Sequence, residues 1–289
     1  MSQRREPKRP SERSVVPQAD RGAAGGLTYK LRPRAKALAV VLLAALVSLA
    51  LVSTLLKVLG PGEQSELLTA AIVDQLSLTQ PNPDFAQTAS DLLQQAGFTV
   101  DYYPGEEVTV DFYRNLPARD YDLIVLRVHS GISGTTGSIG LFTSEPYDTT
   151  KYVAEQRAVR LGQAHYYDGG EVYFGIYPEF LASDARGTFD KALIVMMGCF
   201  GLKRTDLAKA FVQRGAAAVV SWDGLVSAPH TDAATENLLQ HLLVDRLTVG
   251  QAVAKTMAEV GPDPANGSSL LFYPPEGAAG GPGEAYSAR

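Results

Sequence analysis

The chain has 289 residues, with 26 Lys or Arg against 31 Asp or Glu and a formal net charge of −5. A negative balance argues against nucleic acid as a partner, and a single cysteine excludes an internal disulfide. The charges are unevenly distributed, because residues 1–36 hold ten basic and three acidic side chains, which leaves 16 and 28 beyond them. The two parts therefore need separate interpretations.

An uncharged segment follows the basic N-terminal part. Ala37 to Leu56 reads ALAVVLLAALVSLALVSTLL, twenty residues with a lysine on each side. A helix of that length spans about 30 Å, the thickness of a bilayer core. We therefore predict a single transmembrane helix at 37–57, preceded by a disordered, basic, cytoplasmic leader at 1–36. The positive flank stays inside, so the C-terminal part lies outside the cytoplasm, anchored to the cell membrane.

A cleaved signal peptide is the alternative interpretation of this segment. Its apolar region is usually only about 7–15 residues long and follows a short leader. The segment here is longer and its leader has 36 residues, although Ala-Leu-Val-Ser offers small residues for cleavage. Whether the segment is cleaved stays open at this point.

Residues 60–274 are long enough for one sizeable core. Apolar or alternating runs predict six strands, at 70–76, 98–103, 123–128, 192–197, 216–222 and 269–273. Helical patterns fall between them, at 85–95 after an Asp84 cap, at 110–116, from Thr205 or Asp206 to Gly215, at 231–243 and at 249–260. This alternation predicts an α/β fold whose mostly parallel sheet is covered on both faces.

Three stretches of this part lack such patterns. Residues 133–140 have the composition of a flexible loop. Residues 141–189, rich in Tyr and Phe, predict an insertion with one or two short elements. The tail at 275–289 is rich in Gly, Ala and Pro and is predicted to be disordered.

Two predicted strand ends carry residues suited to chemistry. The strand at 123–128 runs into His129, and the strand at 192–197 runs into Gly198 and Cys199, the only cysteine. Neighbouring parallel strands lie about 4.8 Å apart, so a histidine and a cysteine leaving adjacent ends could face one substrate. An imidazole can take the thiol proton, and the thiolate can then attack a carbonyl.

Small residues surround this pair. Gly131, Gly198 and Gly201 would let a backbone approach closely, and backbone N–H groups nearby could point at an oxyanion. A helix starting just after Cys199 would lower the pKa of its thiol further. The structural alternative is a buried cysteine that plugs a strand end and a histidine bonded in a polar crevice.

The motifs LIVLRVHSG and LIVMMGCFG resemble the caspase-like cysteine peptidases, the fold of caspases, legumains, gingipains and CHAT-domain proteases. DLAKAFVQRGAAAVVSWDGLVS is similar to the CHAT pattern after the cysteine, and TVGQAVAKTMAEV and SSLLFY are similar to its last helix and closing strand. The resemblance covers about 70–273. It implies a caspase-like α/β/α sandwich of six strands with an insertion around 141–189.

The resemblance also implies roles for residues. His129 would be the acid and base and Cys199 the nucleophile of this thiol protease, and the oxyanion donors would be the backbone N–H groups of Cys199 and of Ser130 or Gly131. The chain departs from the family pattern in two places. Ser130 follows the histidine where glycine is usual, and Gly198 precedes the cysteine where alanine or serine is common. The histidine and cysteine are also 70 residues apart, which requires the insertion.

Asp223 and Trp222 end the strand at 216–222 and are candidates for a substrate pocket, in which Asp223 would bind a basic side chain. The alternative is an aspartate that caps a loop. No Cys or His cluster has metal-ligand spacing, and we expect no cofactor.

The sequence thus predicts a membrane-anchored, extracytoplasmic cysteine endopeptidase that forms an acyl-enzyme on a protein or peptide substrate. A catalytically inactive caspase-like domain that binds a protein or peptide at the membrane surface is the alternative. Acyl transfer to an amine in place of water is a third possibility.

Overall fold

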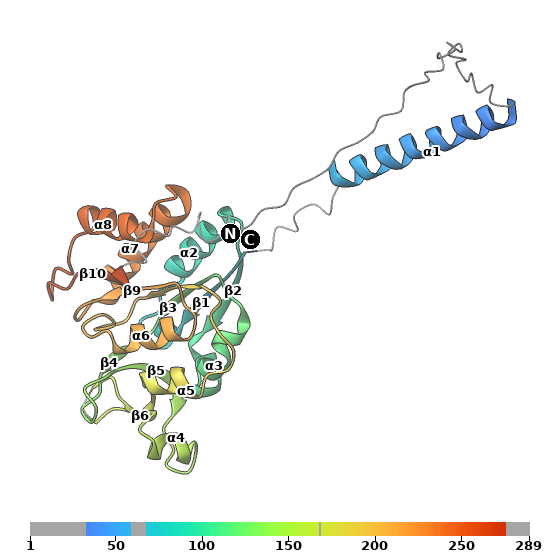
Figure 1. The fold of residues 1–289 in the computed structure, drawn as a ribbon. Coiled ribbons are helices and arrows are strands. Elements are labelled where there is room, and N and C mark those ends of the chain that lie inside the picture. Colours follow the sequence, from blue (N-terminus) through green and yellow to red (C-terminus); the bar gives the residue numbers. More distant parts are fainter. Residues whose placement is uncertain (1–32, 59–67, 168, 276–289) are drawn as a thin grey trace, which may run out of the picture. The chain divides into compact units, whose positions relative to one another are not determined.

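The computed structural model describes residues 33–58, 68–167 and 169–275, and the chain divides into two compact units, Met1–Gln64 and Ser65–Arg289 (Figure 1). Apart from 33–36 and Pro275, the predicted leader at 1–36 and the predicted tail at 275–289 lie outside the described residues. Each unit is described by itself.

The first unit contributes one helix, α1, Pro33–Val58, which includes the apolar segment predicted to cross the membrane. Its side chains are described at Leu38 and at 42–53. Among the residues that the structure describes, no helix combines the length and apolar character needed to span a bilayer. The transmembrane span stays a prediction.

The second unit is built on a six-stranded sheet with the order β10-β9-β8-β3-β1-β2. Its strands are β1 Thr69–Asp74, β2 Thr99–Pro104, β3 Leu123–Arg127, β8 Leu193–Met196, β9 Ala218–Trp222 and β10 Leu270–Tyr273. All neighbours are parallel except β9 and β10. The predicted α/β fold with a mostly parallel six-stranded sheet is confirmed.

Helices cover both faces of this sheet (Figure 1). On β3, Leu123 and Val125 pack with one layer, and Ile124 and Leu126 pack with the other. The first layer contains α2 Pro83–Gln95, α7 Ala228–Leu239 with its π-helical extension Gln240–Val244, and α8 Val249–Glu259. The second contains α3 Val110–Asn115, α5 Pro178–Ser183 and α6 Asp206–Gln213. Both faces are apolar because each must be buried.

The insertion is larger than the sequence predicted. It forms a four-stranded antiparallel sheet with the order β4-β5-β7-β6. Its elements are β4 Ser130–Ile132, β5 Ile139–Pro146, the short helix α4 Val153–Arg157, β6 Leu161–Ala164 and β7 Tyr173–Ile176. These strands were not predicted because glycines interrupt the alternation of apolar and polar side chains. At Gly140, for example, a Cβ would lie 3.0 Å from the Tyr177 ring, so the strand has a glycine where the pattern would place a side chain.

One helix start differs from prediction. Helix α2 begins at Pro83 and is capped by Asn82, whose side chain accepts a hydrogen bond from the Phe85 N–H at 3.2 Å. Asp84 therefore lies in the first turn and is not the cap. Helix α6 begins at Asp206, seven residues after Cys199. No helix start lies directly after the cysteine.

Candidate active site

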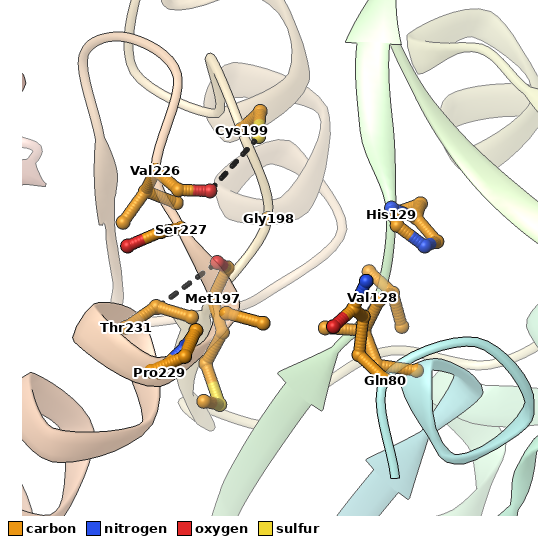
Figure 2. Close-up of a pocket in the computed structure, with 12 residues that line it drawn as sticks. Gln80, Val128, His129, Met197, Gly198, Cys199, Val226, Ser227, Pro229 and Thr231 are labelled. Atoms are coloured by element: carbon orange, nitrogen blue, oxygen red, sulfur yellow. Dashed lines mark hydrogen bonds between the residues drawn. The ribbon is translucent and has the colours of Figure 1, made fainter. Parts of the chain in front are cut away.

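His129 and Cys199 leave the C-terminal ends of neighbouring parallel strands. The last register pair joins Leu126 of β3 with Met196 of β8, and His129 and Cys199 each follow this pair by three residues. Both side chains line one cavity of about 360 Å³ (Figure 2). This is the edge of a parallel sheet where ligands bind.

The Cys199 thiol is held by the loop between β9 and α7. Its Sγ donates to the Val226 carbonyl oxygen at 3.6 Å, the upper dashed line in Figure 2. Burial raises the pKa of Cys199, and the carboxylate of Asp263 raises it further. A helix start directly after Cys199 would lower this pKa, but α6 begins seven residues away. The thiol is therefore protonated at neutral pH in this state.

The His129 side chain contacts the segment that follows β1 and a tyrosine of the insertion. Its Nε2 lies 2.9 Å from Thr79 Oγ1, and its ring centroid lies 4.5 Å from that of Tyr166. Its backbone N–H donates to Gln75 Oε1 at 3.0 Å, while Gln75 Nε2 donates to the Tyr166 hydroxyl at 2.6 Å. Burial, and then the positive charge of Arg127, lower the pKa of His129 to about 4.

The two groups are thus uncharged at neutral pH and bonded to other partners. Among the described residues, no hydrogen bond joins the imidazole of His129 to the thiol of Cys199. A thiolate and imidazolium pair would require the thiol to leave Val226 and the imidazole to leave Thr79. The structure thus brings His129 and Cys199 to one cavity, each with its own hydrogen-bond partner.

A buried ionic cluster supports the His129 side of the cavity. Arg127, two residues before the histidine, donates from Nη1 to Asp74 and from Nε and Nη2 to Asp232, all at 2.8 Å. Its Nη2 also donates to the Gln80 carbonyl oxygen at 2.8 Å. The guanidinium thereby fixes the segment from Asp74 to Gln80, which supplies the partners of His129.

Sequence analysis missed Gln75, Thr79 and this cluster. One signal was present: a charged Arg127 inside an otherwise apolar, doubly buried run must have a buried partner. The partner itself was hidden, because Asp232 is 105 residues further along the chain.

Ser130 and Gly198 are in direct contact, and the size of each residue limits the other. The Ser130 hydroxyl donates to the Cys199 carbonyl oxygen at 2.6 Å. A Cβ at position 198 would collide with this hydroxyl and lie 2.6 Å from the Val128 carbonyl oxygen. Serine after the histidine thus occupies the space that a side chain before the cysteine would need, so the two departures from the expected pattern form one compensating exchange.

Ser130, Gly131 and Gly201 are not among the residues that line this cavity. Gly131 pairs with Gly140 of β5 and lines a second cavity of about 220 Å³ beside the insertion. The Phe142 N–H donates to the His129 carbonyl oxygen. In an antiparallel pair of strands, successive residues point their N–H groups alternately towards and away from the neighbouring strand. The Gly131 N–H therefore points towards β5, and the Ser130 N–H points away from it. Gly201 packs against Ser221, where a Cβ would collide with its hydroxyl.

Asp223 and Trp222 do not line the cavity either. Asp223 Oδ1 accepts from the Ser269 N–H at 2.8 Å, which is a loop-fastening role. Trp222 is fully buried, and its Nε1 donates to Thr231 Oγ1 at 2.9 Å. Since Thr231 lines the cavity, Trp222 supports the wall from behind.

The loop that carries Val226 is firmly anchored. Asp263 accepts from both the N–H and the hydroxyl of Ser227, at 2.9 and 2.8 Å, and Ser268 Oγ donates to the Leu225 carbonyl oxygen. Burial raises the pKa of Asp263, but the hydrogen bonds from Ser227 and Asn266 outweigh it, so this pKa lies well below its ordinary value. The carboxylate stays charged and keeps the loop in place.

The neutral His129 makes stability depend on pH. The unfolded chain binds a proton at this imidazole near the ordinary pKa of 6.5, whereas the folded chain does so only near 4, so folding is weakened as pH falls between these values. His129→Asn carries no titratable group at this position. Between pH 7 and pH 4.5 its unfolding free energy should therefore fall by about 2 kcal/mol less than that of wild type. Urea unfolding at both pH values measures this. His165→Asn is the control, and parallel pH dependences of wild type and His129→Asn would contradict the expectation.

Comparison with known proteins found no family model that matches the chain and no matching curated protein. Among the described residues, no group of His, Cys, Asp or Glu could hold a metal ion. What the cavity does must be argued from its own residues.

Proposed function

We propose that the chain is a membrane-anchored, extracytoplasmic cysteine endopeptidase of caspase-like fold, with His129 and Cys199 as its dyad. One observation carries the proposal: the only cysteine and a histidine follow the ends of adjacent parallel strands and line the same cavity. The mostly parallel six-stranded sheet agrees with the resemblance. The membrane anchor is supported by the apolar segment at 37–57 and by the exposure of its large apolar side chains between Leu42 and Val52.

The mechanism begins with release of the resting contacts. A substrate peptide that enters the cavity displaces the thiol from Val226, and the imidazole turns from Thr79 towards Cys199. His129 takes the thiol proton, the sulfur attacks the scissile carbonyl, and the backbone N–H groups of Cys199 and Ser130 donate to the oxyanion. The imidazolium protonates the leaving amine. His129 then removes a proton from water, which hydrolyses the acyl-enzyme and returns the thiol.

Cleavage of a peptide library by the full-length chain tests this proposal. We expect no turnover by Cys199→Ala, and a loss of about 10²–10⁴-fold in kcat/KM for His129→Ala, since general acid and base catalysis contributes that much. His165→Ala is the matched control, because this histidine lies outside the cavity of Cys199 and should leave kcat/KM unchanged. Cleavage that survives Cys199→Ala would overturn the proposed mechanism.

A non-catalytic domain that binds a peptide is the second candidate. It is favoured by the bonds that hold the two groups apart, to Thr79 and to Val226. Alkylation of Cys199 by iodoacetamide, followed against pH with a bound peptide present, separates the two. The peptidase requires faster alkylation in wild type than in His129→Ala, whereas identical rates, with no cleavage, favour the binding domain.

A further inference from the structure

The cavity beside Cys199 has an uncharged lining. Apart from His129 and Cys199, the described residues that line it carry no ionisable side chain, and its walls are mostly apolar. Leu76, Val128, Met197 and Pro229 are among them. Figure 2 shows Met197, Pro229 and Thr231 on one side and Val128 and Gln80 on the other. A ligand side chain in this cavity would therefore contact apolar surface and few free polar groups.

The polar groups of the walls already have partners. Thr231 Oγ1 donates to the Met197 carbonyl oxygen at 3.0 Å and accepts from Trp222. The Ser227 hydroxyl donates to Asp263. Gln80 differs, since its side chain is exposed at the rim of the cavity and only its backbone takes part in the hydrogen bonds shown for the described residues.

The buried charges of the Arg127 cluster are not available to a ligand in the cavity. The Arg127 guanidinium donates to Asp74, Asp232 and the Gln80 carbonyl oxygen. Asp232 binds that guanidinium with both oxygens and accepts from Asn82 as well. None of the three charged groups lines the cavity. The Asp263 carboxylate lies behind Ser227, and both of its oxygens already accept hydrogen bonds. A charged side chain placed in the cavity would therefore be desolvated without a counter-charge in direct contact, which is costly.

We propose that this cavity receives the side chain of the residue whose carbonyl is attacked, and that it selects an uncharged residue, such as leucine, methionine, phenylalanine or glutamine. The inference rests on the proposed function, because it places the scissile carbonyl at Cys199. The side chain of that residue lies nearest the Cys199 sulfur when the carbonyl is attacked. Gln80, at the rim, is the position where a new charge would change the selection.

The test measures kcat/KM of the full-length chain on fluorogenic peptides that differ only at this residue. We expect Leu, Met, Phe and Gln to exceed Asp, Glu, Lys and Arg by about 10- to 100-fold. Gln80→Glu should raise the ratio of Lys to Leu cleavage by about tenfold, because it adds a carboxylate at the rim. Gln94→Glu makes the same chemical change on an exposed turn of α2 and should leave the ratio unchanged.

The outcomes separate the two proposals. Preference for Asp, Glu, Lys or Arg in the wild type overturns the selection while the peptidase stands. An unchanged Lys to Leu ratio in Gln80→Glu also overturns it, because the side chain then lies outside this cavity. Absence of cleavage for every peptide overturns the proposed function and this inference with it.

Discussion

Arg127→Met should lower the unfolding free energy by about 3–5 kcal/mol, the cost of breaking a buried ion pair from one side. The side chain of Arg127 is 1% exposed, and those of Asp74 and Asp232 are 2% and 5% exposed. Methionine fills similar space but leaves two carboxylates buried without a cation. Thermal unfolding should show a fall in Tm on the order of 10 °C for a domain of this size.

Two controls isolate the charge from the packing. Arg204→Met removes an arginine that is 58% exposed and lies 3.7 Å from Asp206, and such a surface pair contributes little. The triple variant Arg127→Met, Asp74→Asn, Asp232→Asn removes the cation and both carboxylates together, and should recover much of the loss. A loss within 1 kcal/mol of wild type at pH 7 would contradict the role given to this cluster.

The loss of the Arg127 side chain should also disturb the cavity, because the ionic cluster connects three elements that surround it. Asp74 ends β1, Arg127 ends β3, and Asp232 lies in α7. The segment after Asp74 supplies Gln75 and Thr79 to His129. We infer that the buried charges fix the histidine in its resting place, at the cost of a fold that depends on them.

The predictable part of this molecule is the part with strong periodicity. The strands at 123–128 and 192–197 are continuous apolar runs, so their ends, and therefore the positions of His129 and Cys199, followed from burial on both faces. The alternation of strands and helices predicted a parallel sheet, and the structure then placed β3 beside β8. The insertion was underestimated, because glycines such as Gly140 break the alternating pattern of its strands.

The state of the site was beyond prediction for a different reason. Whether a thiol is reactive depends on which atom it meets, and Val226 meets Cys199 only because Asp263 and Ser268 fasten a loop more than thirty residues earlier in the chain. Directly after Cys199 the chain is not helical, since Phe200 adopts a left-handed conformation with φ of 63° and Gly201 packs on Ser221. Tertiary contacts of this kind leave no local pattern.

Gly198→Ala should destabilise the fold by about 1–3 kcal/mol, the usual cost of overpacking. The new Cβ would collide with the Ser130 hydroxyl and lie 2.6 Å from the Val128 carbonyl oxygen, and a backbone oxygen cannot turn aside. The displaced backbone also carries Cys199, so labelling of the thiol by a peptidyl electrophile should slow. Urea unfolding and labelling rates of the full-length chain measure both effects.

A double-mutant cycle with Ser130→Gly tests whether the two residues form one exchange. Ser130→Gly alone should cost about 1–2 kcal/mol, from a lost hydrogen bond and a more flexible backbone. In the double variant one collision is gone and only the Val128 oxygen still crowds the methyl group, so the loss should be smaller than the sum of the single losses by about 1 kcal/mol or more. Gly134→Ala is the control, because a Cβ there meets nothing within 4 Å. Additive losses would mean that Ser130 and Gly198 act independently, and the residues around the dyad would then have to be explained one at a time.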